Sequence, residues 1–98
     1  MPDIEKIRDI VSEYGSSYGA DRIYLFGSYA RGEMTDRSDI DLRIDKGRIR
    51  GLQFAGLLGD LQDALGVDVD LISTDGMNKD FLDAIMPEEV LLYERRGA

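Results

Sequence analysis

Apolar residues recur at intervals of three and four positions in three segments of the chain, which is the spacing of an amphipathic α-helix. The pattern predicts helices over residues 3–18, 49–65 and 78–86. The expected capping and stop residues are Asp3, Gly15, Gly19, Gly66 and Pro87. The helix over 49–65 is expected to bury one stripe of side chains. That stripe consists of Leu52, Ala55, Leu58, Leu61 or Gln62, and Leu65.

A second pattern, the alternation of apolar and polar residues, indicates strands with one face on the core. Strands are expected over residues 23–26, 39–44, 67–73 and 90–93, the last at an edge of the sheet. In residues 39–44 the apolar side chains point to one side, and Asp39, Asp41 and Arg43 point to the other. This alternation predicts a polar face that is free to carry chemistry.

The predicted helices and strands follow one another in alternation, with a short helix over residues 28–31 between the first two strands. Such an order is typical of α/β proteins. We therefore predict an α/β fold with two layers, in which a small mixed sheet packs against helices. With 98 residues, 43% of them hydrophobic, the chain is expected to form a single domain over residues 1–98.

Composition narrows the chemistry that the chain can perform. Cysteine and histidine are both absent, so thiolate catalysis, histidine bases and the usual zinc ligands are excluded. No apolar stretch reaches the ~20 residues of a membrane span, and the charged N-terminus differs from a signal peptide, so we expect a cytoplasmic protein without membrane contact. The net charge of −8 argues against tight nucleic-acid binding. The acidic residues serve solubility, or they bind cations or a basic partner.

The strand over residues 23–26 runs directly into Gly27 and Ser28, ahead of the predicted short helix. Glycine after a strand is often only a turn. The functional interpretation is that Gly27 lets backbone N–H groups approach a phosphate, with the Ser28 hydroxyl as a further donor. Arg31 lies one helical turn later, where its guanidinium could reach a triphosphate. No Walker sequence is present, so a different kind of phosphate site is indicated.

Two acidic pairs suggest a metal site. Asp39 and Asp41 are expected on one face of a strand, roughly 7 Å apart at the base, and Asp68 and Asp70 have the same spacing in the strand over residues 67–73. Such residues are often only solvated acids on the polar side of a sheet. Two such pairs near a glycine-serine turn favour a site for Mg²⁺, with Mn²⁺ as the alternative ion.

At these positions the chain resembles the nucleotidyltransferase superfamily that includes DNA polymerase beta. The family pattern is Gly-Ser, ten residues, and then Asp-x-Asp, which here is Gly27-Ser28 followed by Asp39-Ile40-Asp41. The stretch "GSYARGE…SDIDL" is similar to minimal nucleotidyltransferases, often called MNT proteins. The resemblance extends over nearly the whole chain, from the N-terminal helix to "VDLIS" and the closing "EEVLLYE".

The resemblance implies a role for each matching residue. Gly27 and Ser28 would bind the β- and γ-phosphates of ATP, and Arg31 would contact a phosphate. Asp39 and Asp41 would bind two Mg²⁺ ions. Asp70 would be the third carboxylate, binding the catalytic metal and helping to deprotonate the acceptor hydroxyl, whereas Asp68 matches no catalytic position as well.

The resemblance also implies a partner. Minimal members of the family act as antitoxins of HEPN–MNT pairs and transfer AMP from ATP to a tyrosine of a HEPN ribonuclease toxin. Few residues follow Asp70, so we expect a partner to supply the acceptor. Two alternatives are a non-catalytic antitoxin that acts by binding its toxin, and a nucleotidyltransferase that modifies a small molecule or an RNA end. The missing second domain and the acidic charge count against the last of these.

Overall fold

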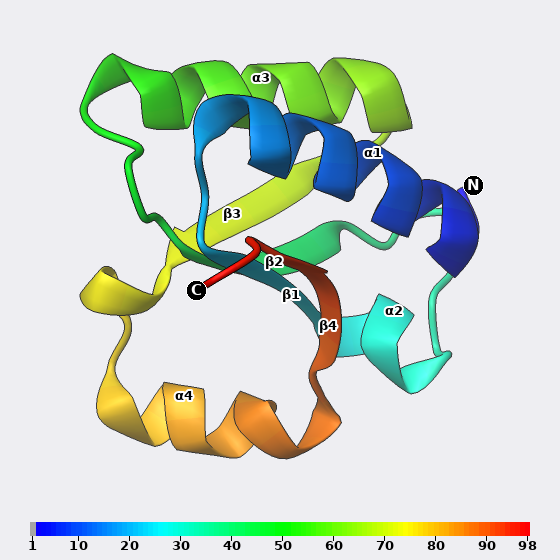
Figure 1. Ribbon diagram of the computed structural model, residues 1–98. Helices are drawn as coiled ribbons and strands as arrows, with labels where there is room; N and C mark the ends of the chain where they lie inside the picture. Colours follow the sequence, from blue (N-terminus) through cyan, green and yellow to red (C-terminus); the bar gives the residue numbers. More distant parts are fainter. Residues whose placement is uncertain (1) are drawn as a thin grey trace.

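The computed structural model describes residues 2–98, in which four α-helices alternate with four β-strands (Figure 1). The helices are α1 (Ile4–Tyr18), α2 (Gly27–Arg31), α3 (Leu52–Leu65) and α4 (Lys79–Ile85). The strands are β1 (Arg22–Phe26), β2 (Ile40–Asp45), β3 (Val69–Ser73) and β4 (Val90–Glu94). One-turn 3₁₀ helices follow β3 and α4, over Thr74–Gly76 and Met86–Glu88. The predicted order of elements is confirmed. Within residues 2–98, no helix has the length and hydrophobicity that crossing a membrane requires.

The four strands form one mixed sheet in the order β3-β2-β1-β4. β1 is antiparallel to both β2 and β4, whereas β2 and β3 are parallel. A parallel pair needs a crossover connection, and α3 supplies it. β4 lies at an edge, as its sequence predicts. The predicted small mixed sheet is therefore confirmed.

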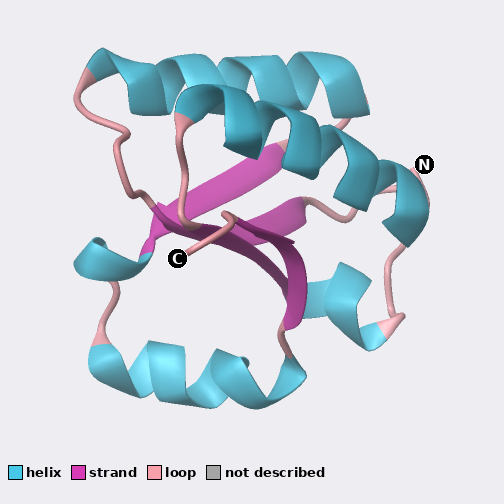
Figure 2. Cartoon of the chain, viewed as in Figure 1, coloured by secondary structure: helices cyan, strands magenta, loops and turns pink. Residues whose placement is uncertain are grey.

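The main core lies between one face of the sheet and the layer formed by α1 and α3 (Figure 2). Ile7 and Val11 of α1 and Leu57 and Leu61 of α3 are fully buried. They pack against the apolar face of the central strands, which consists of Ile23, Leu25, Ile40, Leu42 and Ile44. α4 lies on the opposite side of the sheet (Figure 1). The apolar half of each alternating strand thus holds the helix layer, and the polar half faces α4.

The buried stripe of α3 differs from the prediction. α3 begins at Leu52 rather than at Ile49, and Ile49 is buried in the preceding turn. Leu52 is 91% exposed, and Ala55 is exposed as well. The buried face repeats every four residues through Leu57, Leu61 and Leu65, so it turns away from the predicted first positions.

Gly15 does not end α1, contrary to the prediction. The helix continues to Tyr18 and ends at Gly19, which adopts the left-handed conformation with a φ of 85°. Gly15 is buried instead where α1 crosses the sheet. A Cβ atom there would lie 3.0 Å from side-chain atoms of both Ile23 and Tyr93. Gly15 therefore allows the close approach of α1 to β1 and β4.

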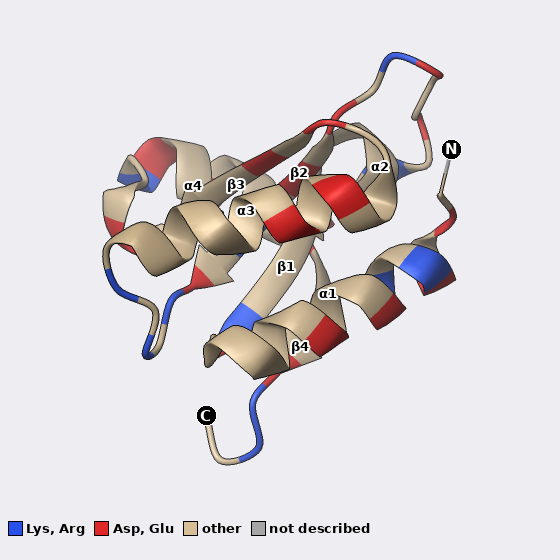
Figure 3. Ribbon diagram, turned by 90° about the horizontal axis from the view of Figure 1, so that it is seen from above, with Lys and Arg blue, Asp and Glu red and all other residues tan. Residues whose placement is uncertain are grey.

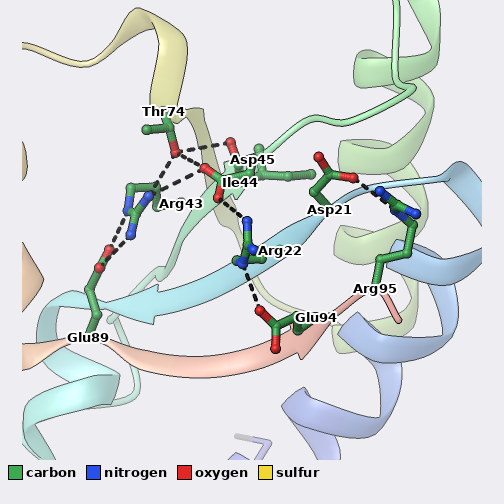
Figure 4. A network of polar contacts seen from close by, with 9 residues as sticks. All are labelled: Asp21, Arg22, Arg43, Ile44, Asp45, Thr74, Glu89, Glu94 and Arg95. Carbon is green, nitrogen blue, oxygen red and sulfur yellow. Dashed lines mark hydrogen bonds and ion pairs between the residues drawn. The ribbon is translucent and has the colours of Figure 1, made fainter. Parts of the chain in front are cut away.

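Arg43 lies on the predicted polar face of β2, yet only 5% of it is exposed. Its guanidinium donates to both carboxylate oxygens of Glu89, at 2.6 and 2.7 Å, and to Thr74 Oγ1 at 2.9 Å (Figure 4). It also lies over the Tyr24 ring, 4.1 Å from the centroid. A buried charge is tolerated only when it is paired. This network therefore fixes the chain segment before β4 to the centre of the sheet.

Candidate active site

A cleft of about 390 Å³ opens between the polar face of the sheet and α4. Its polar residues come from β1–α2, β2, β3 and the turn after α4: Gly27, Ser28, Arg31, Asp41, Asp70 and Glu88. Its apolar residues are Phe26, Ile72, Phe81 and Ile85. Five of the six residues predicted to bind nucleotide or metal therefore meet in one cleft.

The glycine turn, which consists of Gly27 and Ser28, lies against β2. The antiparallel register places Phe26 opposite Asp41, so that Gly27 leaves the sheet beside the Asp41 side chain. Gly27 has a φ of +76°, a conformation that other residues rarely adopt. A Cβ atom there would collide with the Asp41 carboxylate, whose Cγ would be 3.1 Å away. Both the backbone angle and the available space thus require glycine at this position.

Arg31 and Glu88 close one side of the cleft. Nη1 of Arg31 donates to both carboxylate oxygens of Glu88, each at 3.2 Å. The backbone N–H of Gly27 donates to Glu88 Oε1, also at 3.2 Å. Nε of Arg31 donates outside the cleft to Glu33, at 2.8 Å. The glycine turn and Arg31 therefore already bind one carboxylate together.

Asp41 and Asp70 are neighbours across the parallel strands. The register pairs Asp41 with Asp70, and Figure 3 shows acidic positions on β2 and β3 side by side. Asp68 precedes β3 and lines a different hollow. The strand register therefore places Asp70, rather than Asp68, beside Asp41. The role of Asp70 as the third carboxylate stays a prediction.

Asp41 has a pKa raised to about 6. Burial is the largest cause, followed by the negative charges of Asp70 and Asp39, while Arg31 acts in the opposite direction. At neutral pH the site therefore holds a crowded carboxylate whose charge is unfavourable unless a cation compensates it.

The raised pKa of Asp41, of which burial is the largest cause, predicts that stability falls as pH rises. Between pH ~4 and ~6 the folded chain holds a proton on Asp41 that the unfolded chain has lost, so the free energy of unfolding decreases across that range. At pH 7 we expect Asp41→Asn to raise this free energy by about 1 kcal/mol, since solvent screens part of the shift. Thermal unfolding without divalent cations, measured from pH 4 to 7, should show a flatter profile for Asp41→Asn. Asp68→Asn is the control and should keep the wild-type profile.

Asp39, the third acid predicted to bind metal, lies apart from Asp41 and Asp70. It immediately precedes β2, so the strand alternation does not fix its direction, and it lines a neighbouring hollow of about 620 Å³ together with Asp68. Its charge nevertheless raises the pKa of Asp41. Within residues 2–98, no three acidic side chains are gathered as a preformed metal site. The inclusion of Asp39 in a metal site stays a prediction.

The donor set fits a hard divalent cation. Asp41 and Asp70 present carboxylate oxygens from adjacent strands, which are the ligands that Mg²⁺ prefers. Burial first, and then the charges of Asp70 and Asp39, raises the pKa of Asp41, so a bound cation would favour its ionised form. Asp39 is near enough to contribute charge. These observations are compatible with a magnesium site, and metal binding itself is a proposal.

Glu88 is the one polar residue of the cleft for which the sequence predicted no role, although it begins the closing "EEVLLYE" of the family resemblance. It lies 61 positions after Gly27 in the chain, in a segment where acidic residues are common. Nothing in its local pattern distinguishes it from a solvated acid. Only the path of the chain from α4 back to β4 brings it to the glycine turn.

Comparison with known proteins gives a family for this arrangement. Residues 5–97 match the family described as "Polymerase beta, Nucleotidyltransferase". Protein adenylyltransferase MntA of Thermococcus cleftensis is 32% identical over 95 residues, which cover 92% of this chain and 96% of that protein. A relative from Methanocaldococcus jannaschii that carries a protein adenylyltransferase name is 31% identical over 96 residues, covering 93% and 98% of the two chains.

Solved structures agree with this assignment. A minimal nucleotidyltransferase structure has a TM-score of 0.78 and 32% identity, and the match covers 91% of this chain and 95% of that one. The fold is also shared with the complex of a tri-AMPylated Shewanella oneidensis HEPN toxin and its MNT antitoxin. That match has a TM-score of 0.70 and 20% identity, and it covers 94% and 73% of the two chains.

Proposed function

This chain belongs to the polymerase beta nucleotidyltransferase family, and we propose that it is an antitoxin that transfers AMP from ATP to a tyrosine of a cognate HEPN ribonuclease. The observation that carries the proposal is the cleft in which Gly27, Ser28, Asp41 and Asp70 meet. It combines donors for phosphate with acids for a cation and for a proton. Relatives with protein adenylyltransferase names support the choice of a protein as acceptor.

The glycine turn supplies the nucleotide-binding half of the site. The backbone N–H of Gly27 and the hydroxyl of Ser28 bind the β- and γ-phosphates, and Arg31 neutralises part of their charge. Because these donors are fixed at the end of β1, they hold the α-phosphorus beside the acids on β2 and β3. Phe26 and Phe81 form an apolar wall of the same cleft, with their ring centroids 5.9 Å apart.

The acids supply the other half. Asp39, Asp41 and Asp70 would hold Mg²⁺, with Mn²⁺ as the alternative, and the ions would supply positive charge to the attacking and leaving oxygens. In the transfer, the tyrosine oxygen bonds to the α-phosphorus of ATP, the bond to the β-phosphate breaks, and pyrophosphate leaves. Asp70, the more exposed of the two paired acids, takes the proton from the tyrosine hydroxyl.

The direct test is incubation of this chain with its partner protein, ATP and Mg²⁺, followed by the intact mass of the partner. A gain equal to one AMP unit or a multiple supports the proposal, and substitution of the partner's acceptor tyrosine by phenylalanine should abolish that gain. An unmodified partner that is still neutralised would instead indicate an antitoxin that acts by binding alone.

A thermal shift tests the metal site separately. We expect Mg²⁺ with ATP to raise the melting temperature, because a ligand at 100 times its Kd adds about 2.7 kcal/mol to the free energy of unfolding. The double variant Asp39→Asn with Asp41→Asn should lose most of that rise, because the acids that hold the cation are gone. ATP with a chelator is the control for nucleotide binding alone. An equal rise in the double variant would place the metal elsewhere.

A further inference from the structure

The Glu88 carboxylate occupies the donors that the proposed function assigns to phosphate. It accepts from the Gly27 backbone N–H at 3.2 Å and from Nη1 of Arg31 through both oxygens at 3.2 Å. Its side chain is 27% exposed and lines the same cleft as Asp41 and Asp70. An anionic group thus already occupies this end of the cleft in the free chain.

A carboxylate and a phosphate cannot share these donors. The Gly27 backbone offers one N–H, and in the free chain that N–H donates to Glu88 Oε1 at 3.2 Å. Glu88, Asp41 and Asp70 line the same cleft, whose lining contains one guanidinium, that of Arg31. A polyphosphate entering beside them would be repelled by Glu88 as well as blocked by it.

We propose that Glu88 is an internal competitor of the nucleotide, which holds the glycine turn and Arg31 until the β- and γ-phosphates displace it. The inference rests on the proposed function, because it requires those phosphates to bind at Gly27 and Arg31. Glu88 thereby sets nucleotide affinity and discriminates against ligands with too little charge to replace a carboxylate. It also keeps Arg31 and the glycine turn in place while the cleft holds no ligand.

The structure indicates how Glu88 is released. Its neighbour Glu89 is held by the buried Arg43 through two short hydrogen bonds of 2.6 and 2.7 Å. The backbone at this point is therefore anchored to the centre of the sheet. Displacement of Glu88 needs only rotation of its own side chain toward solvent, and the 3₁₀ turn over Met86–Glu88 stays in place. The competitor can leave without disturbing the fold.

The test is the affinity of the full chain for ATP and for AMP, each with Mg²⁺, measured by calorimetry. In Glu88→Gln we expect the Kd for ATP to fall about 10-fold, since one charged competitor is removed. The Kd for AMP, which lacks the β- and γ-phosphates, should change less than about 2-fold. Glu33→Gln is the matched control, because Glu33 pairs with the same Arg31 but not with Gly27 and does not line the cleft.

Each other outcome contradicts the proposal that Glu88 competes with the nucleotide. Weaker or unchanged ATP binding by Glu88→Gln would mean that Glu88 only positions Arg31. Equal tightening for ATP and AMP, or an equal effect of Glu33→Gln, would indicate general charge repulsion. Should Glu88→Gln not fold, Glu88→Asp keeps the charge but reaches less far, and it must still tighten ATP binding. If neither the wild type nor any variant binds ATP, the proposed function fails as well. If the wild type transfers AMP but Glu88→Gln does not bind ATP more tightly, only the inference about Glu88 fails.

Discussion

Asp70→Asn is expected to lower AMP transfer by at least about 1,000-fold, which corresponds to ~4 kcal/mol in the barrier. Asparagine keeps the shape of the side chain but removes the charge that would hold the cation and accept the proton. Because Asp70 is exposed and belongs to no ion pair in the described chain, the variant should fold normally. The measurement is the mass of the partner protein over time with ATP and Mg²⁺.

Asp68→Asn is the matched control, since it lies two residues away in the same segment and is also exposed. Asp68 lines the neighbouring hollow that Asp39 also lines, and it does not lie beside Asp41 in the cleft. Its transfer rate should stay near that of the wild type, and its stability within about 0.5 kcal/mol. A dead Asp68→Asn beside an active Asp70→Asn would mean that the carboxylates of β2 and β3 do not act in the register described.

Gly27→Ala is the second variant with a large expected effect. Alanine at a φ of +76° costs about 1–2 kcal/mol, and its Cβ would collide with the Asp41 carboxylate. The displaced acid and the altered turn should lower AMP transfer by about 100-fold or more, the size of effect that loss of an oriented donor produces. Melting temperature and AMP transfer are measured on the same preparation.

Gly32→Ala separates the collision from the backbone strain. Gly32 has a φ of +73°, nearly the same as Gly27, but nothing lies within 4 Å of a Cβ built there. It should therefore show a similar loss from strain alone and keep its transfer activity. If Gly27→Ala retained the transfer rate of Gly32→Ala, close contact between the glycine turn and Asp41 would not matter for phosphate binding.

Much of the fold could be predicted from short-range patterns, because the strands are bounded by clear turns and alternate over two residues. The start and buried face of α3 could not, since its leucines satisfy more than one stripe and the partner surface decides between them. Leu52, which fits the predicted stripe, is exposed, while Ile49 is buried ahead of the helix. The burial of Arg43 was equally invisible, because its partner Glu89 lies 46 positions away.

The candidate site could be predicted to the extent that it is a linear motif. Gly27, Ser28 and Asp41 are close in sequence, and the choice of Asp70 needed the family pattern. The strand register now gives a physical reason for that choice. Glu88 could not be found in this way, because its contact with the turn depends on the return of the chain after α4.

The parallel pairing of β2 and β3 has a consequence for local unfolding. β3 is an edge strand that pairs only with β2, and the chain connects the two through the long crossover that contains α3. Opening of β3 would therefore leave the antiparallel pairs intact. The repulsion between Asp41 and Asp70 acts across this one seam. In the absence of a cation we expect this repulsion to favour the opening of β3, and a cation that both carboxylates share would oppose that opening.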